Sequence, residues 1–111
     1  MKYFCMLILM LVTSLSWAGG WSQRGTVTEV YNHGYTIMIK MSGTNVDYTD
    51  TCNSTAYYAL DNTDTSSFDI LFSQILMVHA SGKEAQFWID GNTCVGQNNN
   101  YQKISTMKSF Q

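Results

Sequence analysis

Residues 66–90 read SSFDILFSQILMVHASGKEAQFWID, and this stretch decides the fold because it predicts a helix from Ser67 to about Ser81 that is followed directly by a strand. Ser66 and Asp69 form a capping box at the helix start, and Gly82 suits its end. One helical face carries Phe68, Leu71, Phe72, Ile75, Leu76 and His79. Further apolar residues widen that stripe, so we expect cover on more than one side of the helix: Ile70, Met77 and Val78.

Strand patterns lie on both sides of this helix. Before it, residues 25–31 and 35–41 alternate in strand fashion around a turn at 32–34 and predict a hairpin, and residues 55–60 predict a third strand. After it, residues 84–90 place Ala85, Phe87 and Ile89 on a core face, and Gly91 with Asn92 turns the chain. A fifth strand begins at residues 94–95, is interrupted by a loop at 96–100, and is completed by residues 101–107.

The resulting order is three strands, one helix and two strands, in a mainly β or α+β domain. This order predicts a small five-stranded OB-like barrel with the helix between the third and fourth strands. An open α+β sheet would use the same elements with different pairing. The segment from residue 19 to 111 is long enough for one core and too short for two.

The first eighteen residues have the three regions of a secretory signal peptide. Lys2 is followed by an apolar run to Val12 and then by small and polar residues ending at Ala18. A membrane anchor would need roughly 20 apolar residues, about twice the length of this run. We therefore expect cleavage after Ala18, a mature chain that starts at Gly19, and a periplasmic or extracellular destination.

Cleavage would remove Cys5 and leave one cysteine pair, Cys52 and Cys94. In an oxidising compartment such a pair forms a disulfide, and we expect the two Cα atoms within about 7 Å of each other. Two free thiols or half of a zinc site are the alternatives, but His33 and His79 do not stand at ligand spacing from either cysteine. We predict no metal and no other cofactor.

Charge argues against nucleic acid as a partner. The chain has six Lys and Arg and eight Asp and Glu, and Lys2 lies in the predicted signal peptide, so five basic residues face eight acidic ones. The net charge of the predicted mature chain is thus about −3, and its basic residues are scattered along the sequence.

Residues 57–104 carry a resemblance to known sequences. They combine Tyr-Ala-Leu, a helix that ends in His-Ala-Ser-Gly-Lys, then Phe-Trp-Ile and Gly-Asn-Thr-Cys. In these motifs the chain resembles small exported gammaproteobacterial proteins of unknown function, whose members pair a cysteine before the third strand with one after the fourth. In layout alone it is similar to the binding subunits of AB5 toxins, which are OB-folds that form pentamers and bind cell-surface glycans. That likeness implies a homo-oligomer but transfers no binding residue.

Candidate sites are few. His79 has no nucleophile or carboxylate at a recognisable spacing, and His33 fits a hairpin turn. The loop acids match no recognised calcium motif and read as solvated: Asp47, Asp50, Asp61 and Asp64. Most of the aromatic residues should fill the barrel. We expect Trp88 to differ, because it shares a polar strand face with Glu84, Gln86 and Asp90, and we assign Trp88 and Gln86, together with Trp21, to a candidate contact surface.

Three functions follow, in this order of preference. The first is an exported binding or interaction module for a glycan, a peptide or another protein. The second is a structural or stress-related periplasmic protein without a small ligand. A secreted enzyme ranks last, because the sequence offers no nucleophile with a base, no paired carboxylates and no metal triad.

Overall fold

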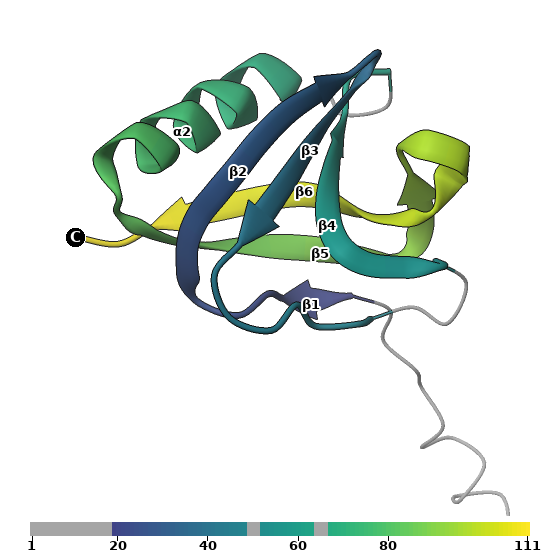
Figure 1. The fold of residues 1–111 in the computed structure, drawn as a ribbon, viewed down its shortest axis with the longest axis horizontal. Helices are drawn as coiled ribbons and strands as arrows, with labels where there is room; N and C mark the ends of the chain where they lie inside the picture. The colour runs from purple at the N-terminus through teal and green to yellow at the C-terminus, as the bar shows by residue number, and fades with distance from the viewer. Residues whose placement is uncertain (1–18, 49–51, 64–66) are drawn as a thin grey trace, which may run out of the picture.

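A computed structural model describes residues 19–48, 52–63 and 67–111, and the predicted signal peptide lies outside these ranges. Within these ranges the chain forms six strands, one α-helix and one short 3₁₀ turn (Figure 1). In chain order the elements are β1 (Gly20–Trp21), β2 (Gly25–His33), β3 (Thr36–Met41), β4 (Ser54–Asp61), α2 (Phe68–Ser81), β5 (Glu84–Val95), η1 (Gln97–Asn99) and β6 (Tyr101–Ser109). Within the described ranges no helix is long and apolar enough to span a bilayer.

Five of the strands close into a barrel. Around the ring, β5 pairs with β2, β2 with β3, β3 with β4, β4 with β6, and β6 with β5 again. The β4–β6 pairing is parallel and all the others are antiparallel. This closure confirms the predicted OB-like barrel with its helix inserted after the third barrel strand, and the open sheet does not form.

Strand β1 is a feature that the sequence pattern missed. It pairs Trp21 with Trp88 on the same side of β5 that β2 joins from Gly25 onward, so β1 and β2 are two parts of one interrupted strand. At the interruption the Ser22 N–H donates to the Phe87 carbonyl over 2.7 Å, and the Ser22 hydroxyl accepts the Phe87 N–H over 2.9 Å. A short break of this kind hides strand periodicity, and it fixes Trp21 beside β5.

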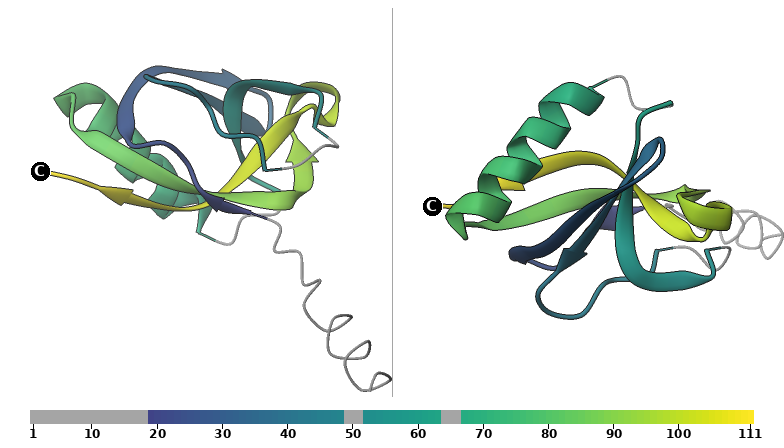
Figure 2. Two further views of the ribbon diagram at one scale, coloured as in Figure 1. Left: turned by 90° about the horizontal axis from the view of Figure 1, so that it is seen from below. Right: turned by 45° about the horizontal axis from the view of Figure 1, so that its top comes forward.

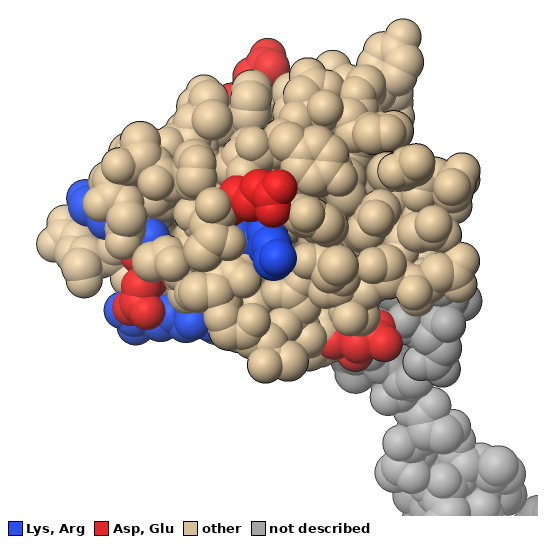
Figure 3. Space-filling model, in the orientation of Figure 1, with Lys and Arg blue, Asp and Glu red and all other residues tan. Residues whose placement is uncertain are grey.

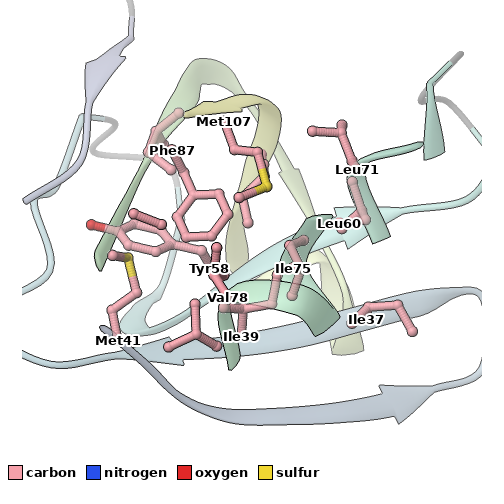
Figure 4. Close-up of a cluster of buried hydrophobic side chains, with 14 residues drawn as sticks. Ile37, Ile39, Met41, Tyr58, Leu60, Leu71, Ile75, Val78, Phe87 and Met107 are labelled. Carbon is pink, nitrogen blue, oxygen red and sulfur yellow. The ribbon is translucent and has the colours of Figure 1, made fainter. Parts of the chain in front are cut away.

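Helix α2 lies across one end of the barrel beside β2 (Figures 1 and 2). Leu71, Ile75 and Val78 are its buried residues and point into the core (Figure 4). Leu76 was expected on that face but is 44% exposed. The buried stripe of the helix runs through positions 71, 75 and 78, and Leu76 lies beside it. Gly82 ends the helix in the left-handed conformation, with φ 71°, as expected. The predicted capping box involves residue 66, outside the described residues, and Ser67 itself makes no capping hydrogen bond.

The main core combines alternate residues of the strands with that helix face. It contains the three β5 residues expected there, Ala85, Phe87 and Ile89, all fully buried. The other main members are Val27, Ile37, Ile39, Met41, Tyr58, Leu60, Leu71, Ile75, Val78, Ile104 and Met107. Burying such a continuous apolar set is what holds a domain of this size together.

Buried polar groups hold the segment 42–48, which runs below the barrel in Figure 1, away from α2. The Tyr58 hydroxyl donates to Gln23 Oε1 and accepts the Val46 N–H, both over 2.8 Å. Gln102 is fully buried; its amide accepts the Tyr48 N–H and donates to the Val46 carbonyl, both over 2.7 Å. Burial raises the pKa of Tyr58 to about 12, so this phenol stays neutral and able to donate.

The predicted disulfide is present. Cys52 and Cys94 are bonded, with their Cα atoms 5.5 Å apart, inside the expected 7 Å. The predicted turn at Gly91 and Asn92 is wrong: β5 continues through both residues to Val95, with a register shift against β6 between Asp90 and Cys94. Cys94 therefore lies near the end of β5 rather than at the start of the last strand.

Candidate functional site

The three residues assigned to a contact surface lie together in the fold. Trp21 in β1 stands directly opposite Trp88 in β5, and their ring centroids are 5.5 Å apart in an edge-to-face arrangement at 86°. Gln86 is two residues before Trp88 and therefore on the same side of β5; its amide donates to the Ser22 carbonyl over 2.9 Å. The structure thus brings Trp21 next to Gln86 and Trp88, which follow it by 65 or more positions in the sequence.

Lys108 of β6 completes this surface. It stands opposite Gln86 across the β5–β6 pairing, and its Nζ lies 4.2 Å from the centroid of the Trp21 ring. A cation over an indole face is attracted to the ring by about 0.5–1 kcal/mol at an exposed site. We call the four residues Trp21, Gln86, Trp88 and Lys108 the tryptophan face.

Trp88 is the most accessible apolar part of the tryptophan face. It is 37% exposed, whereas Trp21 is half-buried between Trp88 and Lys108. The edge-to-face contact holds the Trp88 ring in one orientation, and such pairs contribute about 0.5–1.5 kcal/mol beyond their burial. A ring held in place loses little entropy when a ligand stacks on it.

Two basic residues, Arg24 and Lys83, continue this surface toward the C-terminus, and we call them the cationic margin. Arg24 stacks over the Phe110 ring, with its guanidinium carbon 3.8 Å from the centroid, and its Nε forms an ion pair with Glu84 at 3.1 Å. Lys83 precedes Glu84 in the chain and is exposed. The sequence pattern does not reveal this group, because only the pairing of β2, β5 and β6 brings its residues together.

A second aromatic group covers another side of the barrel. Tyr57 makes edge-to-face contacts with Tyr31 at 5.5 Å and with Tyr101 at 6.1 Å, and the three rings pack over buried Met38 and Ala59. We call Tyr31, Tyr57 and Tyr101 the tyrosine face. The expectation that most of the Trp and Tyr residues fill the barrel is wrong: Tyr58 is buried in the main core and Tyr48 packs against it. The tyrosine face lies instead on the outer side of strands whose inner side forms the core.

Charged neighbours of opposite sign flank the tyrosine face. The Tyr57 hydroxyl donates to Glu29 Oε2 over 3.1 Å, and Lys40 Nζ lies 6.0 Å from the Tyr57 centroid. The hydrogen bond to Glu29 raises the pKa of Tyr57, since the phenol must stay protonated to donate. The pKa of Tyr31 is raised mainly by burial. This face therefore presents neutral phenols and no excess of positive charge.

The titratable residues considered in the sequence take structural positions. His79 is exposed on α2, and its Nδ1 lies 2.9 Å from the Val27 carbonyl, at a register shift in β2. His33 ends β2 at the hairpin, and Asp61 accepts the Thr63 hydroxyl over 2.8 Å. Asp50 and Asp64 lie outside the described residues. Among the residues that are described, no three or more His, Cys, Asp or Glu gather to hold a metal ion.

Comparison with known proteins adds no relative: no family model, no curated protein and no solved structure matches the chain. The resemblances to exported gammaproteobacterial proteins and to AB5 binding subunits therefore stay predictions.

Proposed function

We propose that this protein is an exported binding module that contacts a glycan or another protein through its tryptophan face. The observation that carries the proposal is the edge-to-face Trp21–Trp88 pair, which holds an exposed indole beside the Gln86 amide on the outside of a barrel. Tryptophan rings are enriched at binding hot spots because one side chain supplies a large, rigid contact area.

Export is supported by the disulfide and by the predicted signal peptide. Cys52 and Cys94 form a disulfide. Disulfides persist in oxidising compartments and are rare in cytosolic proteins. Residues 1–18 have the composition of a cleavable signal. Fractionation of the producing cells distinguishes the periplasm from the medium as its destination.

A binding role fits the described chemistry better than catalysis. His79 is directed to a backbone carbonyl rather than to a Ser, Cys or carboxylate side chain, so it lacks the partner that a general base would activate. The tryptophan face offers an aromatic ring, an amide and an ammonium group, which are recognition groups. We therefore propose that the protein is not an enzyme.

The test is a combined glycan and peptide array probed with the wild-type protein and with Trp88→Ala. We expect a small set of wild-type signals that the substitution removes. Tyr57→Ala is the matched control, because it deletes an aromatic ring from the tyrosine face and should leave those signals in place. Wild-type and Trp88→Ala patterns that coincide, or an empty array, would count against the proposal and favour a structural protein without a ligand.

A further inference from the structure

We infer that the tryptophan face binds an acidic polysaccharide, with a sugar ring stacked on Trp88 and its carboxylate or sulfate group held by Lys108 and the adjoining cationic margin. This inference rests on the proposed function and narrows its ligand to one chemical class. It starts from the distribution of charge on the barrel.

Positive charge is concentrated next to the tryptophan face. Of the five Lys and Arg in the described residues, three surround the start of β5 and the end of β6: Arg24, Lys83 and Lys108. Glu84 is the acid among them, and it is engaged by Arg24 at 3.1 Å. Blue surface accordingly gathers toward the left end of the molecule in Figure 3. A chain whose net charge is negative thus presents a local excess of positive charge.

Aromatic and cationic groups are interleaved on this surface rather than separated. Lys108 lies over the Trp21 ring, and Trp21 contacts Trp88, so the ammonium group and the exposed indole flank the same ring. A carboxylated sugar ring has an apolar C–H face that stacks on an indole and an anionic group at its edge. The arrangement suits a ligand that carries both properties in one ring.

The side chains around Trp88 are polar: Gln86 and Asp90 lie two residues before and after it on the same side of β5, and the Asp90 carboxylate accepts hydrogen bonds from sugar hydroxyls. Gln86 stands beside it on β5, and the exposed Thr106 stands opposite it on β6. An amide and a hydroxyl donate and accept hydrogen bonds, as sugar hydroxyls require. A protein partner would instead need a fully buried apolar centre, whereas here Trp21 is already covered by Lys108.

A membrane surface fits less well than a polysaccharide. The two cations nearest the rings, Lys108 and Arg24, are held over Trp21 and Phe110 rather than extended beyond them. Residues that anchor proteins to bilayers insert their rings into the acyl boundary while the basic groups reach the headgroups. Trp88 lies on the side of a strand within a closed barrel, which favours a ligand that lies along the strands.

The experiment uses tryptophan fluorescence of the exported protein, in which the expected cleavage after Ala18 leaves Trp21 and Trp88 as the tryptophans. The probes are dextran, carboxymethyl dextran and dextran sulfate, which share one sugar backbone and differ in charge. We expect both charged polymers to bind at least about tenfold more tightly than dextran at low salt, and to weaken as salt screens the ion pairs.

Variants locate the site. Lys108→Gln should weaken binding of the charged polymers by about fivefold, the upper range for an exposed ion pair. Lys40→Gln removes the same charge beside the tyrosine face and should change binding less than twofold, within about 0.4 kcal/mol. Thr106→Glu keeps both indoles and adds a negative charge opposite Trp88, and it should abolish binding even if Trp88→Ala proves unstable.

Each contrary result has a definite meaning. Equal affinity for dextran and its charged derivatives would overturn the acidic-ligand inference but leave the contact surface intact. Equal loss in Lys108→Gln and Lys40→Gln would show non-specific charge attraction and overturn the site. Binding to vesicles of anionic phospholipid but to none of the polymers would overturn the ligand class. The proposed function itself fails only through the Trp88→Ala array comparison.

Discussion

Removing the disulfide should cost the protein a large part of its stability. In Cys52→Ala/Cys94→Ala the unfolded chain regains the freedom of a loop between cysteines 42 residues apart. The loop-entropy relation converts that separation into about 4 kcal/mol at 25 °C. Domains of about 93 residues have a free energy of unfolding of roughly 5–14 kcal/mol, so the variant should still fold but with a much reduced margin.

Urea unfolding followed by circular dichroism measures this loss. With an m-value of about 1–2 kcal/mol/M, the midpoint of the double variant should fall by about 2–4 M. Its m-value should also rise, because an unfolded chain without the cross-link exposes more surface. Ser73→Ala, at an exposed position of α2, is the control and should leave the m-value unchanged and move the midpoint far less. A midpoint shift below about 0.5 M, with an unchanged m-value, would refute this account of the disulfide.

Three further predictions concern the buried phenol, the N-terminus and the assembly state. Tyr58→Phe leaves the Val46 N–H and the Gln23 amide oxygen without a partner and should lower the free energy of unfolding by about 1–3 kcal/mol. Because folding raises the pKa of Tyr58 from 10.0 to about 12, the contribution of Tyr58 to wild-type stability is intact below pH 10 and falls between pH 10 and 12. In urea titrations the difference in free energy of unfolding between wild type and Tyr58→Phe should therefore shrink in that range. A difference that stays constant would contradict the assigned pKa. N-terminal sequencing of the exported protein should begin at Gly19, and a start at Met1 would contradict the signal peptide. Light scattering should give an oligomer if the layout shared with AB5 binding subunits extends to assembly, and a monomer mass would rule that out.

The barrel could be predicted because local patterns specify its parts. Alternation in residues 25–41 and 84–90, and helical spacing in residues 68–81, each reflect a periodic burial that a short window reveals. The position of the helix between the third and fourth barrel strands then limited the topology. The cysteine pair could be predicted by counting, since only two cysteines remain after the predicted signal peptide.

Features that depend on distant pairing could not be predicted in the same way. Strand β1 is only two residues long, and the interruption at Ser22 hides its continuity with β2. The turn expected at Gly91 followed from composition, yet β5 continues through residues 91–93 as a bulge, because Asp90 and Cys94 pair with the consecutive residues Lys103 and Gln102 of β6. The alternation around Tyr57 would look the same whether its ring pointed into the barrel or outward. The sequence therefore did not show that Tyr57 belongs to an outer aromatic cluster.

The candidate site was predicted only in part for the same reason. Trp88 and Gln86 share one strand face, which alternation reveals, whereas Lys108 reaches Trp21 only through two strand pairings. The cationic margin at Arg24 likewise arises from residues that are about 60 positions apart. Charge counting along the chain showed scattered basic residues, and folding gathers three of them.

The most direct test of the tryptophan face is an NMR titration of the ¹⁵N-labelled exported protein with carboxymethyl dextran. The indole N–H signals of Trp21 and Trp88, assigned from single Trp→Phe variants, should shift together with the backbone amides of residues 86–88 and 106–108. The amides of Tyr31 and Tyr57 should stay in place. Shifts confined to the tyrosine face, or indole signals that do not move at saturating polymer, would contradict the assignment of the binding surface.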